Sequence, residues 1–208
     1  VHYLQPYRVD STGKGYKKGP DDIRICLTGA GSAHTAYQVG KCLSMHPCDF
    51  AVQAGIAGAF SREVPIGSLW RVKSDVFADL GAEDDDRFMD LFALGLLQPD
   101  DFPYRDKRLP DCPMTPPALS GLPEADAITV NTVTGKESTL QKWKEKYHPS
   151  LESMEGAAFH YVCLMEKVNF AQLRSVSNYV EVRDKSKWDI PLAVTRLNDT
   201  LIRLIDTI

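Results

Sequence analysis

The chain has 208 residues, of which 43% are hydrophobic and 25% are charged, and its formal net charge at pH 7 is −4. This length supports one sizeable core and is short for two, so we expect residues 1–208 to form a single domain. The acidic balance argues against nucleic-acid binding, and no apolar run is long enough to cross a bilayer. The expected partner is therefore a small molecule, with no nucleic acid and no membrane.

Five cysteines are scattered along the chain without a Cys-x-x-Cys pair, namely Cys26, Cys42, Cys48, Cys112 and Cys163. An odd, scattered set indicates neither a disulfide framework nor a zinc site. We therefore expect a cytoplasmic protein with free thiols that binds no metal and no cofactor.

Apolar runs and turn residues divide the first half of the chain into predicted elements. The pattern predicts a strand over 23–27, a helix over 32–44, strands over 50–54 and 68–77, and a helix over 86–97. Prolines then recur from Gln98 to Glu124, which predicts a long irregular surface excursion.

The second half continues the alternation. The predicted elements are a strand over 127–133, a helix over 138–147, a strand over 150–153, a helix over 155–167, a strand over 172–177 and an amphipathic helix from about Pro191. Apolar residues of that last helix fall on one stripe, namely Val194, Leu197, Leu201, Leu204, Ile205 and Ile208. The sum predicts a three-layer α/β/α domain.

Two segments that flank one predicted helix carry the strongest functional signal, Leu151–Ala158 and Arg174–Asn178. Ligands collect at the carboxyl ends of strands in an open α/β sheet, and each segment places a polar side chain at such an end. Glu155 only accepts hydrogen bonds and suits a ribose diol, while Asn178 offers a donor and an acceptor to a heterocycle. The alternatives are a first-turn helix acid for Glu155 and a polar strand terminator for Asn178.

A second candidate is the glycine turn Thr28–His34, which follows a predicted strand and precedes a helix. A Gly-x-Gly sequence in this context is typical of dinucleotide-binding proteins. However, His34 occupies the third glycine position, and no acidic residue ends a second strand about twenty residues later. We therefore favour a tight turn that packs close to the site, with His34 capping the helix or lining the pocket.

The order of several motifs resembles the nucleoside phosphorylase and nucleosidase superfamily, on its hydrolase side, and within it most resembles the futalosine hydrolases. The motifs are Ala54–Ala59, Glu152–Ala158, Arg174–Asn178, Val182–Asp184 and Trp188–Asp189. The resemblance runs from about Arg24 to the C-terminus. It implies a purine nucleoside phosphorylase-like fold with a mixed central sheet, and a homodimer or larger homo-oligomer.

The same resemblance implies hydrolysis of the glycosidic bond of a 6-oxopurine nucleoside, above all of futalosine to hypoxanthine and dehypoxanthine futalosine in menaquinone biosynthesis. The alternative enzymes are a purine nucleoside phosphorylase and a methylthioadenosine/adenosylhomocysteine nucleosidase. From a different class, the chain could be a nucleoside-binding module without turnover.

By this resemblance, Glu155 binds the 2′- and 3′-hydroxyls of the ribose and Asn178 bonds N7 and the six-position of the base, so these two are the expected catalytic residues. The expected substrate-binding residues are Met154, which packs against the ribose face, Ser177, and the residues of a predicted glycine turn, Gly55, Ile56, Ala57 and Gly58.

Asn178 also bears on the choice of base, because the adenine-specific nucleosidases carry an aspartate at the corresponding position. A 6-oxopurine presents two acceptors, O6 and N7. An ionised carboxylate faces both with like polarity, whereas asparagine donates to O6 and accepts from a protonated N7. A polar mismatch in a buried site costs about 1–3 kcal/mol, so the sequence favours hypoxanthine over adenine.

The segment Ala54–Ala59 is where hydrolysis and phosphorolysis can be told apart. Phosphate must be held by guanidinium groups, hydroxyls or backbone amides, and the phosphorylase relatives place an arginine and a serine beside this turn. The matching positions here are Gln53 and Ile56. Neither can neutralise phosphate, so water is the expected acceptor.

The superfamily opens with a strand whose end carries an acid that activates the attacking water. The given sequence starts at Val1, and its first strong strand signal, Ile23–Thr28, corresponds to a later strand of that fold. Residues 1–20 resemble the polar hairpin between the two. We therefore expect the first strand and its acid to lie in front of the given sequence.

The carboxylate at the 5′ end of futalosine needs a cation, and Arg87, Arg183 and Lys185 are candidates, with solvated surface charge as the alternative for each. An acidic cluster is expected to be a solvated loop and helix start rather than a metal site, since EF-hand-like spacing is lacking. Its members are Asp79, Glu83, Asp84, Asp85 and Asp86.

Overall fold

The structure, a computed structural model, describes residues 8–9, 15–18, 21–85, 87–114, 116–182 and 184–207. The hairpin expected over residues 1–20 falls largely outside this part of the chain. Its described pieces are the strands β1 (Arg8–Val9) and β2 (Gly15–Lys18), which pair antiparallel.

Among the described residues, six strands form a mixed central sheet in the order β11-β4-β10-β9-β5-β8. They are β4 (Phe50–Ala59), β5 (Leu69–Asp75), β8 (Leu109–Pro110), β9 (Glu124–Thr129), β10 (Leu151–Ser153) and β11 (Asn169–Tyr179). The long strands β4 and β11 run parallel, whereas β10 runs antiparallel to β4. β5 also pairs with β11, so the sheet closes on itself.

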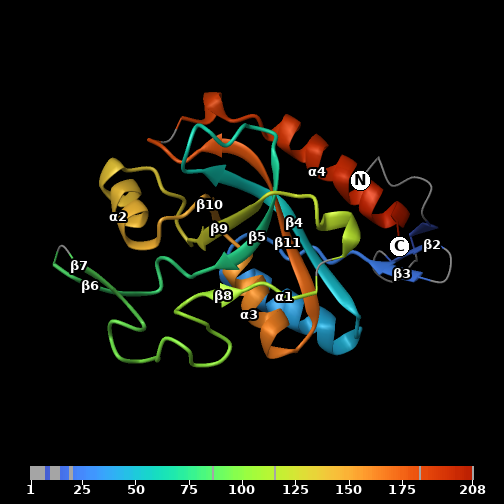
Figure 1. Cartoon of the computed structure of the whole chain (residues 1–208), viewed down its shortest axis with the longest axis horizontal. Coiled ribbons are helices and arrows are strands. Elements are labelled where there is room, and N and C mark those ends of the chain that lie inside the picture. Colours follow the sequence, from blue (N-terminus) through green and yellow to red (C-terminus); the bar gives the residue numbers. More distant parts are fainter. Residues whose placement is uncertain are drawn as a thin grey trace.

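Helices cover both sides of this sheet (Figure 1). α1 (Ser32–Met45) packs on α3 (Gly156–Met165) on one side, and α4 (Ile190–Thr207) lies along β11 and β4 on the other. α2 (Glu137–Tyr147) lies beside the hairpin of β6 (Gly81–Asp84) and β7 (Arg87–Asp90), where Phe88 and Trp143 meet edge to face. The predicted three-layer fold with a mixed sheet is confirmed.

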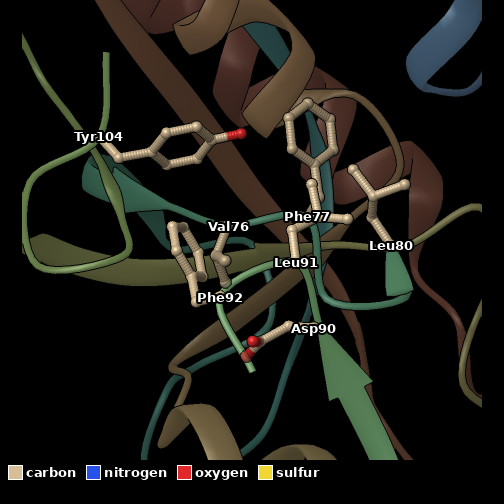
Figure 2. Close-up of a pocket in the computed structure, with 7 residues that line it drawn as sticks. All are labelled: Val76, Phe77, Leu80, Asp90, Leu91, Phe92 and Tyr104. Atoms are coloured by element: carbon tan, nitrogen blue, oxygen red, sulfur yellow. The ribbon is translucent and has the colours of Figure 1, made fainter. Parts of the chain in front are cut away.

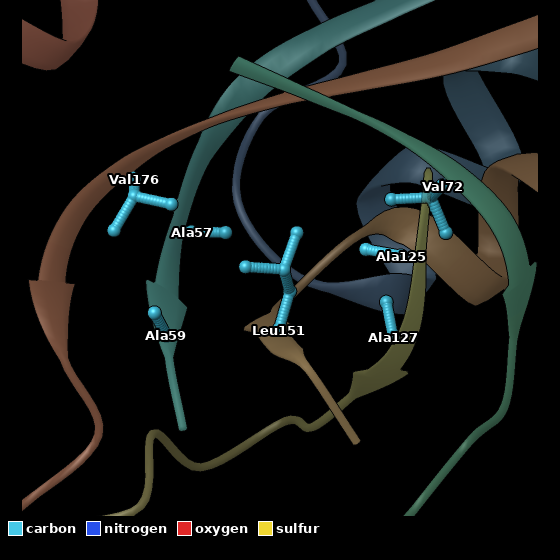
Figure 3. Close-up of a cluster of buried hydrophobic side chains, with 7 residues drawn as sticks. All are labelled: Ala57, Ala59, Val72, Ala125, Ala127, Leu151 and Val176. Carbon is cyan, nitrogen blue, oxygen red and sulfur yellow. The ribbon is translucent and has the colours of Figure 1, made fainter. Parts of the chain in front are cut away.

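The space enclosed by the closed sheet is filled by small and medium apolar side chains from five strands (Figure 3). They are Ala57, Ala59, Val72, Ala125, Ala127, Leu151 and Val176. A narrow closed sheet leaves room for side chains of about this size only. The alanines of β4 therefore follow from packing inside the sheet.

The helices pack on the outer surface of the sheet through two further clusters. Val39 of α1 and Cys163 of α3 meet Phe170 of β11 on one side. On the other side, Leu197 and Leu204 of α4 cover β11, which agrees with the predicted stripe. Val194 at the start of this stripe is exposed, and Ile208 lies outside the described residues.

Two predicted elements of the N-terminal half have different bounds. The strand expected over 23–27 is β3 (Asp21–Arg24), which pairs with β2 rather than with the central sheet, and Leu27 is 69% exposed. β4 continues through the whole glycine–alanine segment that was predicted to turn. The small residues of β4 allow neighbouring strands and their side chains to lie close to it, and they do not mark a turn.

The helix expected over 86–97 is wrong. The chain forms a hairpin of β6 (Gly81–Asp84) and β7 (Arg87–Asp90), followed by turns. Asp85 has a φ of 54°, a left-handed conformation that favours a tight turn, and Asp86 lies outside the described residues. The packing of Phe88 on Trp143 overrides the helical periodicity of the segment.

The strand expected over 127–133 is β9 (Glu124–Thr129), which begins and ends earlier in the chain than predicted. The remaining predicted strands and helices overlap the observed elements. Among its described residues, the proline-rich segment holds the strand β8 and the 3₁₀ turn η2 (Pro117–Leu119) before β9 begins. Within the part of the chain that is described, no helix has both the length and the apolar character to span a membrane.

Candidate functional site

Glu155 immediately precedes α3, and its carboxylate turns away from that helix. Oε1 accepts a hydrogen bond from the backbone N–H of Gly31 at 3.2 Å, and Oε2 accepts from Nη1 of Arg174 at 3.3 Å. The side chain makes no capping bond to α3. The alternative of a helix-capping acid therefore does not fit, and because the side chain is 20% exposed, the carboxylate can still reach a ligand.

Arg174 lies in the middle of β11, is 2% exposed, and was missed from the sequence as a site residue. Besides Glu155, Nη1 donates to the carbonyl of Ile56 at 3.3 Å, and Nη2 donates to Oε1 of Gln53 at 2.9 Å. A Cβ on Gly55 would lie 2.3 Å from Nη1. The absent side chain of Gly55 is therefore what admits the guanidinium.

A cation thus lies beside Gln53 and Ile56, where the sequence predicted none. Burial lowers the pKa of Arg174, and the charges of Glu155 and Asp75 oppose that shift. Its two terminal nitrogens are engaged by protein oxygens. Arg174 therefore presents no free terminal nitrogen to a phosphate at this position.

Asn178 lies near the end of β11, directly after a β-bulge at Ser177. The hydroxyl of Ser177 donates to Oδ1 of Asn178 at 2.8 Å, and Nδ2 of Asn178 donates to the carbonyl of Tyr179 at 3.0 Å. Bulges re-aim side chains in this way. The amide is almost buried and its orientation is fixed, and one N–H and one acceptor position remain for a ligand.

Gly58 gives Asn178 its space. The two residues are paired between β4 and β11, and a Cβ on Gly58 would lie 3.1 Å from Nδ2 of Asn178 and 2.9 Å from Val180. The hydroxyl oxygen of Ser177 also lies 3.3 Å from the carbonyl oxygen of Ala57. The predicted substrate-binding residues of β4 therefore contact side chains of β11. Ile56 and Ala57 do so through their backbone carbonyls, and Gly55 and Gly58 leave space for Arg174 and Asn178 because they have no side chain.

The prediction that Glu155 and Asn178 share one carboxyl edge is wrong, because β10 and β11 run in opposite directions. Glu155 follows the end of β10 and therefore lies beside the middle of β11, whereas Asn178 lies near its end. The contacts on β4 are Ile56 for the Glu155–Arg174 pair and Gly58 for Asn178. Two residues of strand span about 7 Å, a separation that a purine nucleoside can bridge.

The glycine turn before α1 packs onto this site, as expected. Gly29 and Gly31 have positive φ angles, and the N–H of Gly31 is occupied by Glu155. The hydroxyl of Ser32 donates to the carbonyl of Met154 at 3.5 Å. Nδ1 of His34 bonds to the carbonyl of Ala30 in its own turn at 2.8 Å. The turn thus supports Glu155, and the N–H of Gly31 is not available to bind a dinucleotide.

A polar cluster that the sequence did not reveal lies behind Glu155. Asp75, Thr129, His160 and Gln172 are buried there together with Arg174. Burial raises the pKa of Asp75 to about 6 and lowers the pKa of His160 to about 4. The only sequence signal for this cluster was the occurrence of charged and amide residues within otherwise apolar strands.

An apolar pocket opens beyond the end of β5, and its lining includes none of the predicted site residues (Figure 2). The rings of Phe77, Phe92 and Tyr104 border it. Leu80 also lines it, and the neighbouring Asp79 accepts hydrogen bonds from the backbone and side chain of Asn131. Asp79 thus anchors the loop after β9.

The remaining charged candidates are not brought to the site by any described contact. Arg87 and Lys185 are exposed, and Arg183 lies outside the described residues. Glu83 of the acidic cluster forms an ion pair with Lys142 at 3.5 Å. Among the described residues, no three His, Cys, Asp or Glu side chains are grouped so that they could hold a metal ion.

Comparison with known proteins places the chain among futalosine hydrolases. The chain is 32% identical to the futalosine hydrolase of Streptomyces coelicolor over 193 residues, which cover 89% of this chain and 79% of that protein. No protein-family profile matches the chain.

Solved structures share the fold at lower identity. A 5′-methylthioadenosine/S-adenosylhomocysteine nucleosidase from Helicobacter pylori, in complex with butyl-thio-DADMe-Immucillin-A, has a TM-score of 0.80 at 16% identity, covering 99% of this chain and 92% of that one. Futalosine hydrolase of the same organism has a TM-score of 0.78 at 17% identity, covering 99% and 91%.

Proposed function

The chain belongs to the futalosine hydrolase family, and from that premise we propose futalosine as its substrate and Glu155 and Asn178 as the residues that act on it. It is an N-ribosyl hydrolase, and its substrate is a small nucleoside. Two contacts with β4 support the site assignment. Glu155 pairs with the buried Arg174 beside Ile56 of β4, and Asn178 of β11 is held against Gly58 of β4.

Glu155 supports the breaking of the N-ribosidic bond through its charge. The transition state resembles an oxocarbenium ion on the sugar, with negative charge moving into the base. A carboxylate that accepts hydrogen bonds from the 2′- and 3′-hydroxyls lies next to the developing positive charge and stabilises it more than it stabilises the neutral substrate. Gly31 and Arg174 hold this carboxylate in place before the substrate arrives.

Asn178 assists the departing base. Because the carbonyl of Tyr179 can only accept, Nδ2 must face it, and Oδ1 faces the hydroxyl of Ser177. The second N–H of Nδ2 is then available to donate to O6 of a 6-oxopurine, and Oδ1 can accept from a protonated N7. This supports hypoxanthine over adenine as the leaving base.

Water rather than phosphate is the proposed acceptor. The cation nearest to the glycine segment of β4, Arg174, already binds Glu155, Gln53 and Ile56. A phosphate dianion there would have to displace Glu155 and would face its carboxylate at close range. Phosphorolysis is therefore the second candidate, and the phosphate requirement distinguishes the two.

We further propose a cytoplasmic homodimer or larger homo-oligomer that works in menaquinone biosynthesis. Supporting observations are five free cysteines and large exposed apolar side chains, which include Leu80 at the pocket of Figure 2, Leu96 and Phe102. A second copy that covers these side chains would reduce their contact with water.

The test is a comparison of substrates with the full-length protein. The protein is incubated with futalosine, inosine or methylthioadenosine, with and without phosphate, and the released base is quantified. The variants are Glu155→Gln and, as the matched control, Glu137→Gln, which changes an exposed glutamate at the start of α2. We expect hypoxanthine from futalosine without phosphate, a loss of about a hundredfold or more in Glu155→Gln, and no change in the control. Base release that depends on phosphate, or full activity of Glu155→Gln, would contradict the proposal.

A further inference from the structure

Asp75, at the end of β5, is fully buried behind Glu155 and touches the start of the helix that Glu155 precedes. Its Oδ1 accepts hydrogen bonds from the N–H of Val76 at 2.8 Å and from the hydroxyl of Thr129 at 3.0 Å. The same hydroxyl oxygen accepts from the N–H of Ala157 at 2.7 Å. One hydroxyl therefore links the buried carboxylate to the first turn of α3.

The other oxygen of Asp75 meets the strand that carries Arg174. A Cβ on Gly156 would lie 2.1 Å from Oδ2 of Asp75 and 2.2 Å from Nε2 of Gln172. Both atoms therefore occupy the space that a side chain on Gly156 would fill, directly beside Glu155. Gln172 and Arg174 are two residues apart on β11 and so point to the same face of the sheet.

Arg174 has two carboxylate neighbours of different kinds. Glu155 is in direct contact and partly open to solvent, whereas Asp75 acts on the guanidinium as a fully buried charge. A buried cation without a counter-charge is strongly destabilised. If Glu155 were the sole counter-charge, its turning to the sugar hydroxyls would leave Arg174 without one.

We propose that Asp75 is a positioning residue for hydrolysis, which acts through Arg174 so that the buried triad of Asp75, Arg174 and Glu155 presents a net negative charge to the sugar. Without Asp75, the charges of Arg174 and Glu155 cancel, and the site facing the oxocarbenium ion is neutral. Because a cationic transition state is affected more than a neutral substrate, Asp75 raises kcat and changes KM little. The inference rests on the proposed function.

The other groups that face Asp75 do not supply this charge. Arg108 is a cation that lowers the pKa of Asp75; it stands outside the triad and donates to the carbonyl of Ala127 and the hydroxyl of Ser74. His160 of α3 has its pKa lowered to about 4 by burial and is therefore neutral at pH 7. Gln172 of β11 and Thr129 of β9 carry no charge. Asp75 is the negative group of this cluster.

The test compares Asp75→Asn with Asp126→Asn, a change of the same chemistry on β9 whose carboxylate pairs with Lys73 and Ser74 instead. The measurements are kcat and KM for the nucleoside substrate, and the affinities for two nucleoside analogues, one with a permanently cationic ring in place of the sugar and one with a neutral carbocyclic ring.

We expect kcat of Asp75→Asn to fall about tenfold or more with KM little changed, and affinity to fall for the cationic analogue but not for the neutral one. Asp126→Asn should match the wild type. Unchanged kcat, or an equal loss of affinity for both analogues, overturns the inference. An inactive wild type would overturn the proposed function instead.

If Asp75→Asn does not fold, the wild type decides the question. Burial raises the pKa of Asp75 to about 6, so lowering the pH from 7.5 to 5 protonates it. The ratio of affinities for the cationic and neutral analogues should then fall about tenfold, and a constant ratio overturns the inference.

Discussion

Replacing Asp75 by asparagine should change how the free energy of unfolding depends on pH. Burial raises the pKa of Asp75 from 3.8 to about 6. Between these values the folded protein holds a proton that the unfolded chain has released, so the free energy of unfolding falls as the pH rises through this window. A shift of this size corresponds to about 3 kcal/mol.

His160 has the opposite effect over nearly the same range. Burial lowers its pKa from 6.5 to about 4, so the folded protein lacks a proton that the unfolded chain binds. The free energy of unfolding therefore rises with pH through this window, again by about 3 kcal/mol. In the wild type the two contributions largely cancel. In Asp75→Asn the contribution of His160 remains alone.

The assay is urea denaturation followed by circular dichroism, from pH 4.5 to pH 7.5, for the wild type, Asp75→Asn and the control Asp126→Asn. The stability of Asp75→Asn relative to the wild type should increase by about 2 kcal/mol between these two pH values, and that of the control should not. A constant difference between the wild type and Asp75→Asn would refute the reasoning, because Asp75 would then titrate alike in the folded and unfolded states.

Two further variants test the contacts of the site. In Asn178→Asp, the ratio of kcat/KM for 6-aminopurine nucleosides to kcat/KM for 6-oxopurine nucleosides should rise by about one to two decades, since a buried polar mismatch costs about 1–3 kcal/mol. Parallel assays with inosine and adenosine measure this ratio. An unchanged ratio would remove Asn178 from base recognition. Gly55→Ala places a Cβ 2.3 Å from Nη1 of Arg174, so kcat should fall about tenfold or more. The control Gly121→Ala adds a Cβ that meets open space and should leave kcat unchanged. Equal kcat values for the two variants would mean that Arg174 can move without affecting hydrolysis.

The sequence predicted the fold class and the segments of the site because both depend on local patterns. Alternating apolar runs locate β4, β9, β10 and β11, and the residues around Glu155 and Asn178 form compact motifs. Local patterns do not fix strand direction or pairing. The closure of the sheet through β5 and β11, and the opposite directions of β10 and β11, are properties of the assembled sheet.

The same limit explains the residues that were missed. Arg174 was part of a recognised motif, yet its role depends on Gly55, which is distant in sequence and adjacent in space. Asp75 becomes a functional candidate only because residues from β9, α3 and β11 surround it. The predicted helix over 86–97 failed for a related reason, since Phe88 is held by Trp143 from a different part of the chain.

The most direct test is a crystal structure of the full-length protein with a non-hydrolysable inosine analogue. We predict that the ribose hydroxyls lie within hydrogen-bond distance of Glu155, that O6 and N7 of the base lie against the amide of Asn178, and that Met154 packs on the sugar. An analogue bound elsewhere, with Glu155 contacting only Gly31 and Arg174, would contradict the account.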